Sequence, residues 1–442
     1  MEQTQNEKIS LINGKIHTQT GTVTNITFEN GRIVSLEDEA ASFNSKVIDL
    51  RGRTVLPGFC DAGLDFFSWA ESQERLNLSS VHSTKEFVES LKVYVNSNPN
   101  PLRGWYIAEN LNDDVIVSHD DIEGIIPSVP CAVIDKKFSH AILNTPAMNE
   151  LNMPQDSVEP VELNQHLPEL TEENIIYLIK NYAQKINSLG ITEIWADFFQ
   201  NDGNSQKLWD IFSRDAYDLL KFRLRCNFGF NNVALLNEFL STGLRTGDGL
   251  PFCKFGGILI KDELEQTEQK NMIYSSHLSG CQVISDNNKS CLSALERVIK
   301  KVRKNTRHLV KNVNSSLIER MRLLGLGGIF ISGQDSNFIH ETFKNGLVFC
   351  GGSGDFLISP LKLIGNLVSK GLSVSEALSI YTWGASWNSS NESRRGELSV
   401  GNDADLVILE QDPFSVRPEE IENIDVIMTF SAGCAVYDSG VL

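Results

Sequence analysis

One stretch, residues 54–66, constrains the fold of this chain more than any other. A short apolar run leads into a Pro57-Gly58 bend, and a second apolar run follows it. The chain then delivers Asp61 and Asp65 where this strand ends, with Gly63 between them. Polar side chains are therefore expected at the carboxyl end of this strand.

Beyond residue 66 the sequence alternates between helical and strand-like segments. Amphipathic helices are predicted over 83–95, 171–189, 290–301 and 315–324, where polar caps begin the segments and Gly190 and Gly325 end two of them. Short apolar runs rich in β-branched or aromatic residues are predicted as strands: 105–108, 132–134, 191–198, 222–226, 257–260, 281–284, 308–310, 328–331 and 347–350. Repeated β–α units predict a parallel sheet, and about eight of them predict a closed barrel.

Both ends of the chain are rich in strand signals. Asn13-Gly14 and Asn30-Gly31 are hairpin signals near the start, and residues 404–409, 425–430 and 433–437 are predicted strands near the end. We therefore predict an α/β fold: a distorted (β/α)8 TIM barrel at residues 55–395. A small composite β-sandwich is predicted from residues 1–54 and 396–442.

Composition and charge limit the classes of partner. With 442 residues and a formal net charge of −18, the chain shows no large basic patch, so nucleic acid and anionic membranes are not expected as partners. No apolar run is long enough to cross a bilayer, and no secretory signal is evident. The eight cysteines contain no CxxC pair, which favours buried free thiols in the cytoplasm over a cysteine-bound zinc ion.

Several motifs resemble those of one family. Leu56-Pro57-Gly58-Phe59, the run at residues 375–382 and Ala404-Asp405-Leu406-Val407 are similar to motifs of the metal-dependent amidohydrolase superfamily. The run at residues 139–147, which contains His140, resembles a motif of its amidohydrolase 3 (exoenzyme-like) branch. The resemblance covers nearly the whole chain. It implies a site at the carboxyl end of the barrel, where bound divalent ions activate water to hydrolyse carbon–nitrogen bonds.

The resemblance also places the family's metal ligands on particular residues of this chain. Gly63 and Asp65 stand where the family has two histidines on the first barrel strand. Leu259, which cannot bind a metal, stands at the position of the bridging lysine. Lys261 lies two residues further on, and a shift of register would give it that role.

The later strands show the same departure from the family pattern. Asp286 (or Ser285) and Asn312 stand where two further histidine ligands are implied. Asp355, in Gly352-Ser353-Gly354-Asp355, matches the aspartate that handles the proton, although one extra glycine blurs the register. His140 stands where relatives contact substrate, and a structural role in a loop is an equal alternative.

Two classes of function follow from these residues. The first is a non-catalytic or much altered homologue whose barrel mouth binds a small molecule through His140, Asp65, Asp286 and Asn312. The second is a working hydrolase of carbon–nitrogen bonds with an atypical metal site, in which Asp355 and Lys261 would be catalytic. No cofactor is expected, although Asp65, Asp286 and Asp355 could hold Mg²⁺ or Ca²⁺ weakly. These carboxylates could instead be solvated or paired with Lys261 and Lys311, and a homodimer is possible.

A specific arrangement is expected for Lys261. Its amine is predicted to form an ion pair with Asp65 and Asp355 in place of the metal. The other histidines are expected on the surface rather than at a metal: His17, His82, His119, His166, His277 and His340.

Overall fold

The computed structural model describes residues 8–37, 45–153, 155–199, 209–214, 219–286, 289–313, 315–333, 339–354 and 356–442. The chain divides into two compact units. One consists of Met1–Phe66 with Lys180–Leu442, and the other of Phe67–Ile179.

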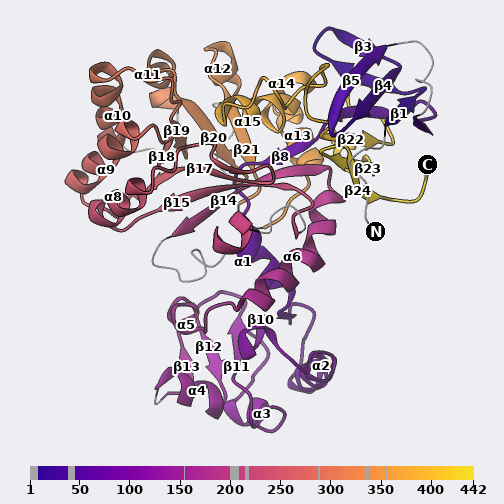
Figure 1. The fold of residues 1–442 in the computed structure, drawn as a ribbon. Helices are drawn as coiled ribbons and strands as arrows, with labels where there is room; N and C mark the ends of the chain where they lie inside the picture. The colour runs from indigo at the N-terminus through magenta and orange to yellow at the C-terminus, as the bar shows by residue number, and fades with distance from the viewer. Residues whose placement is uncertain are drawn as a thin grey trace. The chain divides into compact units, whose positions relative to one another are not determined.

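The centre of the first unit is a barrel of parallel strands (Figure 1). In the described residues its sheet has the order β21-β20-β19-β18-β17-β15-β14-β8. The two edges meet where the Ala62 N–H donates to the Gly351 carbonyl at 2.8 Å. The predicted distorted (β/α)8 barrel is therefore confirmed. The strands are β8 (Phe59–Asp61), β14 (Ile191–Phe199), β15 (Arg223–Gly229), β17 (Cys253–Ile260), β18 (Val283–Ser285), β19 (Leu309–Lys311), β20 (Gly327–Ile331) and β21 (Phe349–Gly352), and β16 (Gly249–Leu250) adds antiparallel to β17.

Helices lie outside these strands. In α10 the buried residues Cys291, Leu295 and Val298 recur at helical spacing, so one face packs inward. Gly325, with φ of +65°, ends α11 as predicted. The helices are α8 (Val233–Ser241), α9 (Gln266–Leu278), α10 (Lys289–Lys301), η2 (Ser315–Leu317), α11 (Ile318–Leu324), α12 (Ile339–Lys344), α13 (Pro360–Ser369), α14 (Val374–Ile380), α15 (Trp383–Asn388) and η3 (Pro418–Asn423).

Both ends of the chain build two further sheets beside the barrel. One has the order β5-β4-β1-β6, and the other, β24-β23-β22-β7-β2-β3, joins N-terminal to C-terminal strands. A shared apolar core that includes Leu11, Phe28, Leu406 and Phe430 lies between them. The strands are β1 (Ile9–Ile12), β2 (Lys15–Thr18), β3 (Gly21–Val23), β4 (Asn25–Glu29), β5 (Arg32–Glu37), β6 (Lys46–Asp49), β7 (Thr54–Pro57), β22 (Leu406–Leu409), β23 (Val426–Ser431) and β24 (Cys434–Asp438).

The two predicted hairpins had different outcomes. Asn30 and Gly31 have φ values of 52° and 74° and join the antiparallel strands β4 and β5, as predicted. The prediction for Asn13-Gly14 was wrong, because β1 and β2 pair in different sheets. Asn13 does adopt a left-handed φ of 56°, but its turn carries the chain from one sheet to the other.

The second unit, Phe67–Ile179, has a sheet of its own in the order β13-β12-β11-β10-β9. The predicted strands at 105–108 and 132–134 lie here, not in the barrel, as β10 and β11. The predicted boundaries at residues 54/55 and 395/396 remain a prediction. The elements of the Phe67–Ile179 unit are β9 (Leu76–Asn77), α2 (Thr84–Ser97), η1 (Leu102–Gly104), β10 (Tyr106–Leu111), α3 (His119–Glu123), β11 (Cys131–Asp135), β12 (Ala141–Leu143), α4 (Thr145–Leu151), β13 (Ser157–Val158) and α5 (Pro160–His166). Two further helices, α1 (Phe66–Gln73) and α6 (Glu172–Asn187), each contain residues of both units.

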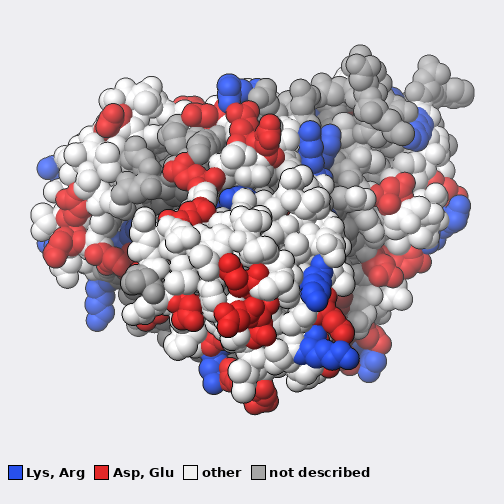
Figure 2. All heavy atoms as spheres, turned by 90° about the horizontal axis from the view of Figure 1, so that it is seen from below, with Lys and Arg blue, Asp and Glu red and all other residues white. Residues whose placement is uncertain are grey.

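Three features bear on the predicted environment. Within the described residues no helix is long and apolar enough to cross a membrane. All eight cysteines are described and are free thiols, and seven of them are buried. On the face shown in Figure 2, acidic side chains gather in several groups while basic ones lie in separate spots. Among the described residues of that face there is no broad basic area that would suit a polyanion.

Candidate active site at the barrel mouth

Parallel strands bring their carboxyl ends to one mouth, and the barrel core shows which side chains line it. Five core residues, each on a different strand, are Trp195, Leu259, Ile284, Leu309 and Ile329. Side chains two residues further along a strand share its face. We call the residues at these next positions the mouth layer: Asp197, Lys261, Asp286, Lys311 and Ile331.

The end of the first barrel strand is tied to the last one through Asp61. Its buried carboxylate, 2% exposed, accepts the N–H groups of Gly63 at 3.1 Å and Ser353 at 3.0 Å, and the Ser353 hydroxyl as well. Burial raises the pKa of Asp61, and these hydrogen bonds oppose that effect. Asp61 therefore helps to close the barrel and offers little surface to a ligand.

Gly63 lies directly against the mouth layer. A Cβ atom at this position would come within 2.2 Å of Cδ1 of Ile331. The tip of the Ile331 side chain thus lies where a Cβ atom at position 63 would be, and this tip would have to turn aside to admit a side chain there. Gly63 has no side-chain donor atom, and the tip of Ile331, which comes from β20 on the far side of β21, lies beside it.

Leu259 belongs to the apolar barrel core and is 6% exposed. It pairs with Ile284 on β18 and with Gly229 on β15, so its position inside the barrel is fixed by both neighbours. Lys261 lies just beyond β17, and its main-chain carbonyl accepts from the Gln269 amide at 3.0 Å.

The sequence reasoning missed a charged pair inside the mouth. Lys311 forms an ion pair with Asp197 through Nζ and Oδ2. Asn227, directly opposite Asp197 in the sheet, donates from Nδ2 to the other carboxylate oxygen at 3.0 Å. The available signal was a lone carboxylate in an otherwise apolar strand run, Trp195-Ala196-Asp197-Phe198. Such a residue stays in a strand at a cost unless it has a partner.

Asp286 and Asn312, which were each predicted to bind the ligand, contact one another in the structure. The Asn312 amide donates from Nδ2 to Oδ1 of Asp286 at 2.9 Å, and Asn312 adopts a left-handed φ of 54°. Burial, followed by the nearby Asp262, raises the pKa of Asp286, while Lys311 and Asn312 act against that shift. The mouth therefore holds a carboxylate whose charge is only partly compensated.

The remaining predicted residues are placed as follows. Asp65 is exposed just after β8, and its N–H donates to the Gly354 carbonyl at 3.3 Å. Asp355 lies outside the described residues, so its expected ion pair with Lys261 remains a prediction. His140 belongs to the Phe67–Ile179 unit, where it is exposed between β11 and β12 and its N–H donates to Oδ1 of Asp135 at 3.0 Å.

A His-bound metal of the kind the resemblance implies needs donors that these positions lack. Gly63 and Leu259 carry none, and Asn312 uses its amide on Asp286. In the part of the chain that the structure describes, no three His, Cys, Asp or Glu side chains gather so that they could hold a metal ion. The described residues therefore do not fit a transition-metal centre.

Comparisons with known proteins agree with this fold. The amidohydrolase family model Amidohydro_3 matches residues 340–437. The Bacillus subtilis (strain 168) protein described as "putative amidohydrolase YtcJ" is 21% identical over 507 residues, which cover 92% of this chain and 93% of that protein. By these two matches the chain resembles the amidohydrolase superfamily in sequence.

Solved structures show the same fold at low identity. An uncharacterized metal-dependent hydrolase from Pyrococcus furiosus has a TM-score of 0.76 and 17% identity over 92% of this chain and all of that one (100%). The Pyrococcus horikoshii OT3 hydrolase has a TM-score of 0.74 and 17% identity, covering 93% of this chain and 99% of the other. Triazine hydrolase from "Arthobacter aurescens" has a TM-score of 0.58 and 12% identity, covering 98% and 95%.

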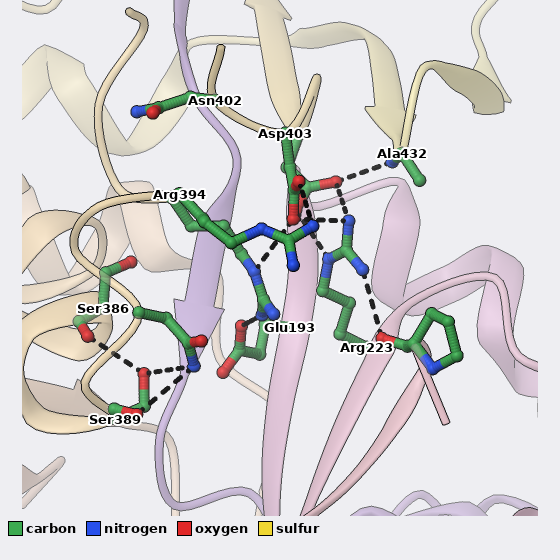
Figure 3. A network of polar contacts seen from close by, with 12 residues as sticks. Glu193, Arg223, Ser386, Ser389, Arg394, Asn402, Asp403 and Ala432 are labelled. Atoms are coloured by element: carbon green, nitrogen blue, oxygen red, sulfur yellow. Dashed lines mark hydrogen bonds and ion pairs between the residues drawn. The ribbon is translucent and has the colours of Figure 1, made fainter. Parts of the chain in front are cut away.

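At the other end of the barrel, where β14 and β15 begin, Asp403 lies close to Arg223 and Glu193 (Figure 3). Arg223, at the start of β15, holds Asp405 through two hydrogen bonds of 2.7 and 3.2 Å and pairs with Asp403 at 3.2 Å. Arg395 joins Asp403 to Glu193 of β14. Burial alone would lower the pKa of Arg223, but Asp405 and Asp403 raise it. This network thus joins the barrel to the sandwich.

One histidine prediction was wrong at this same end. His277 was expected on the surface, but it is 1% exposed and lies 2.8 Å from His308, Nδ1 to Nε2. The Val283 N–H donates to Nδ1 of His308, so the His308 proton sits on Nε2 and points to His277. His277 in turn donates to the Val302 carbonyl at 2.8 Å. The chain of bonds requires both rings to be neutral.

Proposed function

We propose that this protein is a non-catalytic or much altered amidohydrolase-superfamily member whose barrel mouth binds a small molecule. The observation that carries the proposal is the contact between Gly63 and Ile331. In the family that the chain resembles, ligands on the first barrel strand help to hold the ion that activates water. Position 63, where the first of these ligands would stand, carries no side chain, and the tip of Ile331 lies 2.2 Å from where its Cβ would be.

The other mouth residues support the same proposal. Leu259 extends the apolar core to the position of the bridging lysine, and Lys311 brings a positive charge into the mouth. We propose that Asp65, Asp286 and Asn312 contact the ligand. No resident metal is proposed, although Asp65, Asp286 and Asp355 could hold Mg²⁺ or Ca²⁺ weakly.

The proposed setting follows from charge and thiols. Free, mostly buried cysteines suit a reducing cytoplasm. The net charge of −18 disfavours nucleic acid or anionic membrane as a partner, and a homodimer is compatible with a barrel of this size.

Metal analysis of protein purified without chelators tests this proposal. The expected result is zinc, iron and manganese far below one ion per chain, together with no hydrolysis of a panel of amides, cyclic ureas and amino-triazines. A near-stoichiometric transition metal that survives dialysis would contradict it.

A second candidate is an active hydrolase of carbon–nitrogen bonds, non-peptide or amide, with an atypical site. Two observations favour it: similar proteins carry hydrolase names, and burial raises the pKa of Asp286 in the mouth, as suits a proton-transfer group. Here Asp355 and Lys261 would be catalytic. Turnover of any panel member by the wild type, lost in both D355N and K261M, would support this candidate over the first.

A further inference from the structure

A cavity of about 340 Å³ lies within the Phe67–Ile179 unit. It is found where the chain leaves α1, α2 ends, η1 begins and α6 makes its first turns. Its volume is at the lower end of the range for small-molecule sites, which is about 300–1,000 Å³. Such sites combine aromatic or apolar groups with a few polar ones, and this lining does so as well. The lining residues that decide its ligand are Glu74, Tyr94, Asn98, Glu173 and Tyr177.

The walls of this cavity are held in place by hydrogen bonds. The Tyr94 hydroxyl donates to the Glu74 carbonyl at 2.8 Å, and the Tyr177 hydroxyl donates to Oε2 of Glu74 at 3.3 Å. The ring of Tyr106 meets that of Tyr94 edge-on with centroids 5.7 Å apart, and its hydroxyl donates to the Asn98 carbonyl at 2.7 Å. Two lining tyrosines and one carboxylate are therefore positioned before a ligand binds, which reduces the entropy that binding costs.

The charge around the cavity is negative. Glu74 and Glu173 line it, and no Lys, Arg or His is among the described residues of its lining. Arg103 lies next in η1, but Glu71 holds its guanidinium through hydrogen bonds of 2.7 and 3.0 Å. The carboxyl-terminal end of α2, a helix of 14 residues, adds the negative end of a helix dipole, and no basic residue lies in its last turn, which is described in full. The whole unit also holds far more Asp and Glu than Lys and Arg, so its field attracts cations.

We propose that this cavity binds a small organic cation with one positive charge, a primary or a quaternary ammonium. The face of a tyrosine ring attracts a cation within about 6 Å, and a carboxylate beside it pairs with the charge. An anion would instead meet Glu74 and Glu173. A metal ion does not fit, because no three His, Cys, Asp or Glu side chains gather to hold one in the part of the chain that the structure describes. The inference goes beyond the proposed function and does not depend on it, since other residues line this cavity.

Isothermal titration calorimetry of the whole chain with compounds of matched shape tests the inference: 2-phenylethylamine, its trimethylammonium form, the neutral 2-phenylethanol and the anion phenylacetate. At least one of the two cations is expected to bind with a Kd of about 1 mM or lower, and at least about tenfold more tightly than the alcohol or the anion. Preference for the primary amine would show that hydrogen bonds to carboxylates dominate. Preference for the trimethylammonium form would show that the tyrosine rings dominate.

Variants locate the binding in this cavity. E74Q removes a lining carboxylate with little change of shape and should weaken the binding of the preferred cation about tenfold. Y177A removes a ring that is 46% exposed, so the fold should tolerate it, and the binding should weaken about threefold or more. The matched control is E89Q, because Glu89 lies on α2 outside the lining and is 66% exposed. It should bind the cation as the wild type does.

The outcomes distinguish this inference from the proposed function. Wild-type protein that shows no saturable binding of either cation overturns the inference and leaves the proposed function standing. Equal binding of the cations, the alcohol and the anion also overturns it. Cation binding that is unchanged in E74Q or Y177A, or that is lost in D286N, would place the ligand elsewhere and overturns it as well. A wild type purified with stoichiometric zinc, iron or manganese overturns the proposed function and leaves this inference standing.

Discussion

The two ends of the barrel differ in how well their charged side chains are compensated by partners of opposite charge. We call the end where the barrel strands begin the closed end, and the mouth the open end. At the closed end four charged residues, each less than one-tenth exposed, are held in a shared network: Asp403, Asp405, Arg223 and Glu193. At the open end Ile331 and Leu259 fill the interior, and the carboxyl of Asp286 is only partly compensated. The closed end is built for stability, while the open end keeps the unfavourable charge that is typical of sites.

The pKa values of Asp405 and Asp286 shift in opposite directions. Burial would raise the pKa of Asp405, but Arg223, Arg395 and the Ala432 N–H bring it below its ordinary value. Burial does raise the pKa of Asp286 despite Lys311 and Asn312. The motif residue Asp405 and its neighbour Asp403 thus belong to the network that joins the barrel to the sandwich.

The largest expected effect comes from breaking the closed end. D405A leaves the buried Arg223 guanidinium without its two-bond partner, so the free energy of unfolding should fall by about 3–5 kcal/mol. Urea unfolding followed by circular dichroism measures this. The matched control is R394A, which removes an arginine that is 50% exposed and pairs with Asp403, and it should cost only about 0–1 kcal/mol. Equal effects of the two variants would erase the contrast between a buried and an exposed pair.

Acid should weaken the closed end through His308. Burial and the neighbouring His277 lower the pKa of His308 to about 3. Between pH 6.5 and 3 the unfolded chain therefore binds a proton that the folded chain does not, and stability falls as pH falls. The expected slope approaches about 1.4 kcal/mol per pH unit below pH 6.

Urea unfolding at pH 7, 6 and 5 checks this slope. The H277Q/H308Q variant should be less stable at pH 7 but should lose less stability on acidification. A wild type and a variant with identical pH slopes would show that the pair does not stay neutral.

The contact between Gly63 and Ile331 can be tested with a double-mutant cycle. G63A should cost about 1 kcal/mol, because its Cβ must displace the Ile331 side chain. Gly63 is not among the residues with positive φ, so in an I331A background the same change should become neutral or stabilising. The coupling free energy from the four proteins should be about 0.5–2 kcal/mol. Strictly additive effects would mean that Ile331 does not occupy that space.

The smallest effect is expected at Asp286. Because its pKa is raised, its charge opposes folding at neutral pH, and D286N should stabilise the protein at pH 7 by about 0.3–1 kcal/mol. Asn at this position still offers an oxygen to Asn312. The gain should shrink as pH falls towards the pKa of the wild-type carboxyl, where the aspartate is neutral as well. Destabilisation by D286N at pH 7 would mean that the mouth is as well compensated as the closed end.

Much of the fold followed from local patterns. The barrel strands, helices 84–97 and 289–301 and the composite sheets were predictable because apolar periodicity and caps such as Ser83 act over a few residues. The Asn13 turn misled because a left-handed residue fixes a bend and not the partner of the strand that follows. The separate sheet of the Phe67–Ile179 unit was not predicted, because the sequence pattern of an apolar strand does not show which sheet the strand joins.

The sequence showed which side chains the candidate site lacks better than it showed which side chains contact one another there. That Gly63 and Leu259 cannot bind a metal is visible in the sequence alone. That Ile331 fills the space beside Gly63, or that Lys311 reaches Asp197, depends on strands that meet only once the barrel closes. His277 and His308 likewise become a pair only once α9 packs beside β18, whose Val283 N–H donates to His308.

The most direct measurement is an anomalous-scattering map from crystals soaked in zinc and manganese salts, recorded at the absorption edge of each metal. The account predicts no anomalous peak inside the mouth, with Ile331 packed on Gly63 and the Lys311 amine on Asp197. A strong peak in the mouth coordinated by side chains of the barrel strands would contradict it.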